Sequence, residues 1–267
     1  MNEYERMCRK KAVKFGIISC ISLMVFFLIW YICTDVLHLK PDYILPSPVQ
    51  VFKAFVLKLT TKAPDGATLF GHIGSSLKVA LSGYLLGAVI GIPLGIVMAW
   101  FHKVDLFVTP LFDLIRPVPT IAWIPLMILW FGIGLGAKAA IIFVSAFVPC
   151  VINSYSGIKQ TKQVHLWVAQ TFGASRTRML FTVAIPTALP LIFTGLRISL
   201  GTAWMTLCAA EMLASNTGLG YMIQLNRTLA RADLIIVGML TIGCVGILLT
   251  SLLNIFEKKM VRGGRVG

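Results

Sequence analysis

The sequence predicts an all-α integral membrane protein with about six transmembrane helices. Hydrophobic residues make up 57% of the 267 residues and charged residues only 13%, whereas soluble domains carry about 25% charged residues. The apolar residues gather in blocks of roughly 20, the length that a helix needs to cross a bilayer. A backbone in lipid must satisfy its polar groups internally, so we expect each block to be a helix.

The apolar blocks define the expected domain organisation. Predicted spans lie at about 13–35, 76–101, 106–133, 137–158, 188–213 and 232–256. The third contains Pro110, Pro117 and Pro119, so we expect it to be interrupted. The first has no small-residue cleavage site after it, so we interpret it as an uncleaved span. We expect a cytoplasmic tail at 1–14, a transmembrane domain at 15–256 and a basic cytoplasmic tail at 257–267.

The lysines and arginines predict that both termini are cytoplasmic. With the N-terminus inside, the inner segments hold 14 of the 24 lysines and arginines, and the outer loops hold seven. Cytoplasmic loops carry the excess of these residues, so this orientation is favoured, and it places the polar loop at about 159–187 in the cytoplasm. The same rule explains the net charge of +14, so we expect membrane lipid and not nucleic acid as a partner.

The polar loop between the fourth and fifth spans predicts a compact helical elbow. We expect a short helix over about 163–172, ended by Gly173 in a left-handed conformation. Ser175 is a suitable N-cap for a second short helix. Exposed aromatic residues on such an elbow require a partner surface. The candidate apolar contacts are Leu166, Trp167, Phe172, Met179 and Phe181.

Short helices are also expected outside the membrane on the opposite side. Ser47 followed by Pro48 predicts the start of an amphipathic surface helix, and a second short helix is expected at about 221–230. Within the second span, glycines recur every four residues and permit close approach of another helix, either in the same chain or in another subunit. They are Gly83, Gly87, Gly91 and Gly95.

Ionisable residues in apolar spans are costly, so each is a candidate functional residue. Arg197 either meets an anionic substrate along the pathway or is held internally by a carboxylate or by helix carbonyls. Glu211, near the outer end of the fifth span, either lines an outer gate or pairs with a basic residue. Asp113 and Arg116 have the spacing of a pair on one helix face.

The proline-rich break next to Arg116 suggests further pathway residues. A broken helix at membrane depth lines a cavity or packs against protein. Thr120 and Trp123 are therefore candidates for the translocation path, with ordinary packing as the alternative.

The elbow resembles the cytoplasmic "EAA" loop of ABC-importer permeases, and Ala169, Gly173, Ala174 and the pair Ile185–Pro186 match its pattern. The flanking strings are similar to the branch of that family that imports nitrate, sulfonates, taurine or bicarbonate. These strings are "LPSPVQVF", "IRPVPTIAWIPLMILWFGIG", "FTGLRISLGTAW" and "AEMLASNTGLGYMI". The sequence departs from the pattern where Trp167 and Val168 replace the glutamate and the first alanine.

The resemblance implies a type I ABC-importer fold and a coupling helix that docks on an ATPase. The implied coupling residues are Trp167, Val168, Ala169, Gly173, Ala174, Ser175 and Arg176. It also implies a second copy of the chain, two ATPase subunits that bind ATP and Mg, an extracytoplasmic binding protein, and the plasma membrane of a prokaryote. The solute would be small and anionic, like a sulfonate, nitrate or taurine.

The sequence itself offers no energy source and no catalytic site. The glycine-rich string "GIGLGAK" lacks the G-K-[ST] ending of a phosphate-binding loop, so no cofactor is expected in this chain. No cluster of histidines and cysteines suggests a metal, and no catalytic constellation suggests an enzyme. An ion-gradient-driven secondary transporter is the alternative function, but it would require mid-membrane carboxylates and an internal repeat, and neither is evident.

Overall fold

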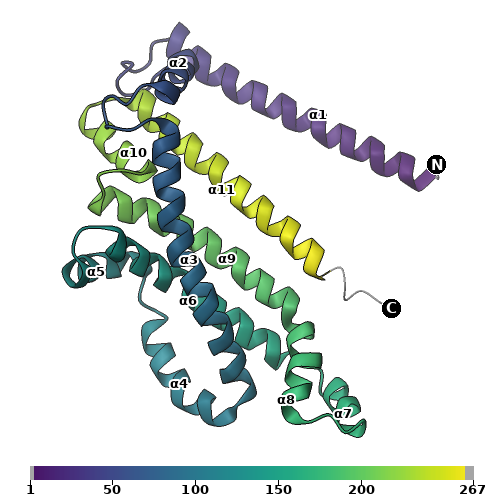
Figure 1. Cartoon of the computed structure of the whole chain (residues 1–267). Coiled ribbons are helices and arrows are strands. Elements are labelled where there is room, and N and C mark those ends of the chain that lie inside the picture. Colours follow the sequence, from purple (N-terminus) through teal and green to yellow (C-terminus); the bar gives the residue numbers. More distant parts are fainter. Residues whose placement is uncertain (1–2, 262–267) are drawn as a thin grey trace.

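The computed structural model describes residues 3–261, and every regular element within that range is helical. Long helices form the body of the molecule, and shorter helices lie at its two ends (Figure 1). The α-helices are α1 (Glu3–Tyr31), α2 (Pro48–Thr60), α3 (Leu69–Trp100), α4 (His102–Ile115), α5 (Ile124–Phe131), α6 (Leu135–Lys159), α7 (Gln163–Thr171), α8 (Arg176–Met179), α9 (Ile185–Ala214), α10 (Leu219–Thr228) and α11 (Ala232–Val261). Two π-helical segments, η1 (Ile32–Val36) and η3 (Leu180–Ala184), and one 3-10 segment, η2 (Thr120–Trp123), complete the chain.

The prediction of about six apolar spans is confirmed. Five continuous helical segments are long and apolar enough to cross a membrane, and a bent pair makes a sixth. The second span begins at Leu69, earlier than the predicted 76, because the Thr68 hydroxyl accepts a hydrogen bond from the Gly71 N–H and caps the helix there.

The expected interruption of the third span is larger than a kink. Helix α4 and the following segment Thr120–Phe131 meet at an angle of 84°. A proline disfavours helical conformation in the residue before it, and Pro117 and Pro119 follow each other closely at this point. The segment predicted as a single span at 106–133 is therefore two arms joined by the break at residues 116–119.

The core is formed where α3 packs closely on α6, which in turn packs on α9. The repeated glycines of α3 allow this close contact. A Cβ atom on Gly83 would lie 2.6 Å from the Ala139 carbonyl oxygen, and one on Gly95 would lie 2.5 Å from the Val151 carbonyl oxygen. The glycine face is thus used for packing within the chain, which was one of the two predicted alternatives.

The short helices divide between the two ends of the bundle. Helices α2 and α10 lie at one end, and α7 and α8 lie at the other, beside the corner between α3 and α4 (Figure 1). Helix α1 stands apart from the bundle, to which it is joined near Trp30, whose indole N–H donates to the Pro46 carbonyl at 3.1 Å. Most of its apolar side chains from Ile17 onward are exposed, so they face lipid or another subunit.

Candidate functional site

The elbow between α6 and α9 has the turn that the sequence predicts. Gly173 has a φ of +76°, in the left-handed region. Its N–H donates to the Gln170 carbonyl at 2.9 Å, and the Ala174 N–H donates to the Ala169 carbonyl at 3.0 Å. These two bonds form a Schellman motif, which ends α7 sharply and turns the chain.

The second half of the elbow is short and continues directly into the membrane span. The Ser175 hydroxyl accepts a hydrogen bond from the Arg178 N–H at 3.3 Å, which confirms the predicted N-cap of α8. The π-helical η3 follows without a break, and α9 begins at Ile185 with Pro186 in its first turn. The fifth span therefore starts earlier than the predicted 188.

The elbow exposes aromatic side chains on its outer surface. Phe172 is 87% exposed, Trp167 is 62% exposed and Phe181 is 64% exposed. Leu166 and Met179, predicted to be exposed as well, are partly buried. The buried anchors of the elbow are Leu180 and Ala184, which pack in a cluster with α3, α6 and α9.

The structure distributes the other predicted coupling residues over both faces of the elbow. Val168 is exposed, and Ala169 and Ala174 are partly buried beside the turn. The Arg176 side chain is directed at its own chain: its Nη2 donates to the Trp100 carbonyl at 3.1 Å, and its guanidinium lies 5.9 Å from the centre of the Phe101 ring. No local pattern in the sequence indicates this contact, because its two sides are 76 positions apart.

Of the pathway candidates at the break in the third span, Arg116 is accessible. Arg116 Nη1 lies 3.8 Å from Asp113 Oδ1, as the spacing of the two residues predicts, and both side chains are 56% exposed. Exposed ion pairs contribute little stability, so this pair leaves Arg116 available to a ligand. Thr120 and Trp123 are partly buried, at the start of the second arm.

Arg197 has an internal partner. Its Nη2 pairs with the carboxylate of Glu257 on α11, which is the internally held arrangement of the two that we considered. The Arg197 side chain is 41% exposed. The partner could not be predicted, because Glu257 is separated from Arg197 by 60 positions.

Glu211 caps a helix. Its carboxylate accepts hydrogen bonds from the Ser76 hydroxyl at 2.8 Å and from the Gly220 N–H at 2.9 Å, and the Leu219 N–H donates to the same hydroxyl at 2.9 Å. A buried carboxylate here satisfies the first N–H groups of α10 and complements the helix dipole. Glu211 is fully buried, and its carboxylate accepts from a serine and a backbone amide and not from a basic side chain. A role at an outer gate stays a prediction.

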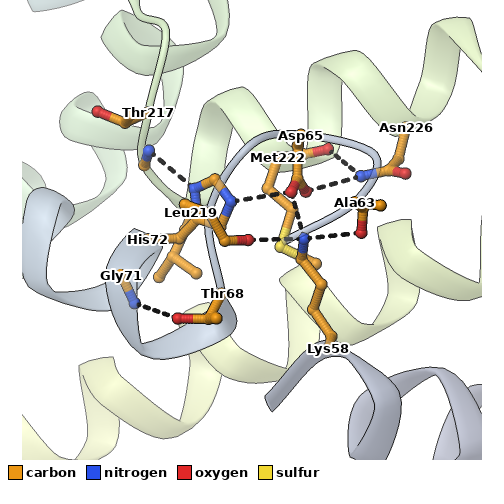
Figure 2. A network of polar contacts seen from close by, with 12 residues as sticks. Lys58, Ala63, Asp65, Thr68, Gly71, His72, Thr217, Leu219, Met222 and Asn226 are labelled. Atoms are coloured by element: carbon orange, nitrogen blue, oxygen red, sulfur yellow. Dashed lines mark hydrogen bonds and ion pairs between the residues drawn. The ribbon is translucent and has the colours of Figure 1, made fainter. Parts of the chain in front are cut away.

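Sequence reasoning missed a buried polar cluster near α10, which we call the Lys58 cluster (Figure 2). It consists of Lys58, Asp65, His72 and Asn226. A lysine in the predicted amphipathic surface helix would be expected to face solvent, but Lys58 is only 1% exposed. Its ammonium donates to Asp65 and to the carbonyls of Ala63 and Ala67, at 3.2 and 2.8 Å. The capping of α2 by Ser47, in contrast, is confirmed.

His72 connects this cluster to the loop before α10. Its Nδ1 accepts the Gly218 N–H at 3.1 Å, so the ring proton resides on Nε2, which lies 3.2 Å from Asp65 Oδ1 (Figure 2). The Asn226 amide donates to the other Asp65 oxygen at 3.4 Å. Asp65 therefore joins three segments: the loop after α2, the first turn of α3, and α10.

Acid is expected to weaken the Lys58 cluster. Burial tends to raise the pKa of Asp65, but hydrogen bonds from Lys58 and His72 outweigh it, so the pKa lies below its ordinary value. Because folding lowers this pKa, ionised Asp65 stabilises the folded state at any pH above the pKa of the unfolded chain, about 3.9. This stabilisation is lost as the pH falls through the pKa of the folded state. We expect the melting temperature of the detergent-solubilised protein to fall in that acidic range, and Asp65→Asn to reduce this acid-dependent fall.

At neutral pH, Asp65→Asn leaves the Lys58 ammonium buried without its counterion, which costs roughly 3–5 kcal/mol. The double variant Lys58→Met/Asp65→Asn removes both charges, so we expect it to be more stable than Asp65→Asn alone. Equal stability of the single and double variants would contradict this role of the pair.

Comparison with known proteins shows the family of the chain. Residues 91–263 match the family of binding-protein-dependent transport system inner membrane components. The chain belongs to this family. The match includes the break, the elbow and the last two spans, and it leaves out α1, α2 and the first part of α3.

Relatives of this permease cover most of its length. The taurine transport system permease protein TauC of Escherichia coli is 36% identical over 90% of this chain and 86% of its own length. The nitrate import permease protein NrtB of Synechocystis is 33% identical over 81% of this chain and 80% of its own. A chain of the inward-facing MetNI methionine ABC transporter has the same fold, with a TM-score of 0.59 at 19% identity over 73% of this chain and 95% of that chain.

The permease is therefore a multi-pass component of a prokaryotic plasma membrane and belongs to the nitrate, sulfonate and taurine branch of ABC importers. Components of this kind are non-enzymatic. Among residues 17–260, whose side chains the structure describes, no group of three or more histidine, cysteine, aspartate or glutamate side chains is arranged to hold a metal ion.

Proposed function

We propose that this permease forms one half of an ATP-driven import pathway and receives its energy through the elbow. The observation that carries the proposal is the exposure of Phe172, Trp167 and Phe181 on a sharply turned, capped elbow at one end of the bundle. Aromatic residues of this kind are frequent hot spots of protein interfaces. In the predicted orientation, this end faces the cytoplasm, where an ATPase subunit would bind ATP and Mg and dock on the elbow.

The engagement of the charged residues in the spans disfavours an ion-gradient mechanism. Proton- or sodium-coupled carriers use intramembrane carboxylates that exchange partners during transport. In the described part of the last two long spans, Glu211 is held by the first amides of α10, and Glu257 is paired with Arg197.

The exposed break in the third span supports assembly of two copies. Residues 116–119 interrupt the helix, and lipid cannot satisfy the backbone groups freed there. Arg116 and Val118 are nevertheless exposed in the single chain. Their N–H groups bond to the Phe112 and Ile115 carbonyls, so the groups left to satisfy are backbone carbonyls. Water in a pathway between this chain and a second copy would satisfy them, so we propose a homodimer with two ATPase subunits.

The substrate that we propose is a small anionic solute such as a sulfonate, nitrate or taurine. The named relatives transport taurine and nitrate, and the accessible Arg116 at the break supplies a positive charge to the pathway. An extracytoplasmic binding protein would deliver the solute at the end formed by α2, α10 and the loop at 215–218.

Transport assays in proteoliposomes test this function directly. The permease, its ATPase subunit and its binding protein are reconstituted, and uptake of labelled taurine and nitrate is measured. We expect uptake that requires ATP and persists when an ionophore removes ion gradients. Uptake that is independent of ATP and abolished by the ionophore would establish the alternative, a secondary transporter.

The turn at Gly173 offers a sharp test of coupling. Among described residues, nothing lies within 4 Å of the position that a Cβ atom on Gly173 would occupy, so a side chain fits but is strained by the positive φ, at about 1–2 kcal/mol. We expect Gly173→Val to reduce uptake strongly by distorting the elbow, while Gly173→Asn, which tolerates this conformation, retains most of it. Membrane insertion should be unchanged in both.

Removal of the apolar contact at Trp167 should have a different effect. Trp167→Ala leaves the turn intact. If Trp167 is a hot spot, we expect the binding free energy of the ATPase subunit to weaken by about 2 kcal/mol or more, which is seen as reduced co-purification. Unchanged co-purification and uptake in both Trp167→Ala and Gly173→Val would show that the elbow is not the docking element.

A further inference from the structure

Arg176 does not point outward with the aromatic residues of the elbow. Its Nη2 donates to the Trp100 carbonyl at 3.1 Å, and its guanidinium lies over the Phe101 ring. Trp100 is the last residue of α3, and Phe101 is the residue that turns the chain into α4. Where side chains are described, the other side-chain hydrogen bonds of residues 163–184 stay within the elbow or reach the adjoining first turn of α9, so this one alone leads to a distant part of the chain.

The same corner of the chain is also tied to the segment that precedes the elbow. Asp105, in the first turn of α4, accepts a hydrogen bond from the Tyr155 hydroxyl at 3.0 Å and from the Lys159 ammonium at 3.4 Å. Both donors lie in the last turns of α6, just before the elbow begins. The corner at residues 100–105 is therefore linked both to the elbow and to the end of the helix that precedes it.

Helix α4 extends from this corner to the break in the third span. It is continuous in spite of Pro110, and Phe112 packs in a cluster with Met98 of α3 and Val151 of α6, which attaches α4 to the core near the break. Movement of the corner would therefore be carried along α4 to the break at residues 116–119, where the helical hydrogen bonds are interrupted and the two arms meet at 84°.

We infer that Arg176 is a positioning residue that transmits movement of the elbow to α4 and so to the break in the third span. This inference rests on the proposed function, because it requires an ATPase that moves the elbow. Arginine suits the role, since its planar guanidinium stacks on an aromatic ring and donates a hydrogen bond at the same time. The role differs from docking: its loss leaves the exposed aromatic contacts of the elbow in place.

The neighbouring Arg178 provides a matched control. It lies on the same four-residue helix and is exposed, and its side chain has no polar partner among the described residues. Arg178→Met thus removes one positive charge from the same helix without breaking the link to the corner. Arg176→Lys retains a charged donor but loses the planar stacking group.

The test uses the complex of the full chain with its ATPase subunit in lipid nanodiscs. A cysteine replaces Val118, which is 40% exposed at the break, and its reaction rate with N-ethylmaleimide is measured with and without ATP. The chain without this substitution gives the background from the native cysteines. Co-purification of the ATPase subunit and the labelling rate without nucleotide are recorded for each variant.

With Arg176 intact, we expect ATP to change the labelling rate by about fivefold or more, at the lower limit of typical coupling between distant sites. Arg176→Met should reduce this change to less than about twofold, with ATPase co-purification retained, and Arg176→Lys should lie between the two. Arg178→Met should behave as the unsubstituted chain.

Three results would overturn the inference. They are an unchanged ATP response in Arg176→Met, no ATP response at the break with Arg176 intact, and loss of ATPase co-purification in Arg176→Met, which would make Arg176 a docking residue. Failure of the unsubstituted chain to bind any ATPase subunit would instead refute the proposed function, so the two failures are distinguishable.

Discussion

Replacement of Gly95 by alanine is expected to destabilise the permease strongly. The new Cβ would lie 2.5 Å from the Val151 carbonyl oxygen and 3.0 Å from the Ser154 Cβ. The nearest obstacle is backbone, so the clash is relieved only if α3 and α6 separate. Overpacking of this kind costs roughly 1–3 kcal/mol and occasionally more, and here it affects the closest helix pair of the core. The measurement is the melting temperature in detergent, followed by size-exclusion chromatography.

Gly74→Ala is the matched control, because Gly74 lies on the same helix and a Cβ there meets no described atom within 4 Å. Alanine forms helices better than glycine by about 1 kcal/mol, so this variant should be as stable as the original or slightly more so. Equal stability of Gly95→Ala and Gly74→Ala would show that α3 and α6 do not pack through the glycine face.

Gly218→Ala is expected to disrupt the end of the molecule formed by α2 and α10. Gly218 has a φ of +119°, and its added Cβ would lie 2.3–2.5 Å from the carboxylate of Glu211. Backbone strain in this region costs about 1–3 kcal/mol, and displacement of the buried carboxylate from its hydrogen bonds costs about 1–3 kcal/mol more. We expect a lower melting temperature and faster proteolysis of the loop at 215–218.

A second glycine with positive φ is a control that distinguishes the cost of backbone strain from the cost of the clash with Glu211. Gly132 has a φ of +71°, and a Cβ there meets nothing within 4 Å in the described part of the chain. Gly132→Ala should therefore show only the cost of strain and be clearly milder than Gly218→Ala. If the two variants are destabilised equally, Glu211 is not held against the loop as the structure indicates.

Local sequence signals predicted the elbow well. Gly173 and Ser175 act through bonds to residues at most five positions away, so the pattern of residue types contains the whole motif. The repeated glycines of α3 likewise predicted close helix packing, but the sequence did not show which helix would be the partner. Periodicity and composition were enough to predict the spans, because a backbone in lipid can satisfy its polar groups only by forming a helix.

The buried polar contacts could not be predicted, because they join residues distant in the sequence. His72 meets Gly218 across 146 positions, and Ser76 meets Glu211 across 135. Lys58 looked like a surface residue of α2, since the solvent face of an amphipathic helix and the rim of a buried site have the same local pattern. Its acceptors come from a loop that has no regular structure to predict.

The central claim is that the elbow lies in the cytoplasm and is covered by an ATPase subunit. The most direct test places a cysteine at Phe172, which is 87% exposed, and compares labelling by a membrane-impermeant maleimide in spheroplasts and in inverted vesicles. We predict labelling only in inverted vesicles, and protection there when the ATPase subunit is bound. Labelling of this cysteine from the outside of spheroplasts would contradict the account.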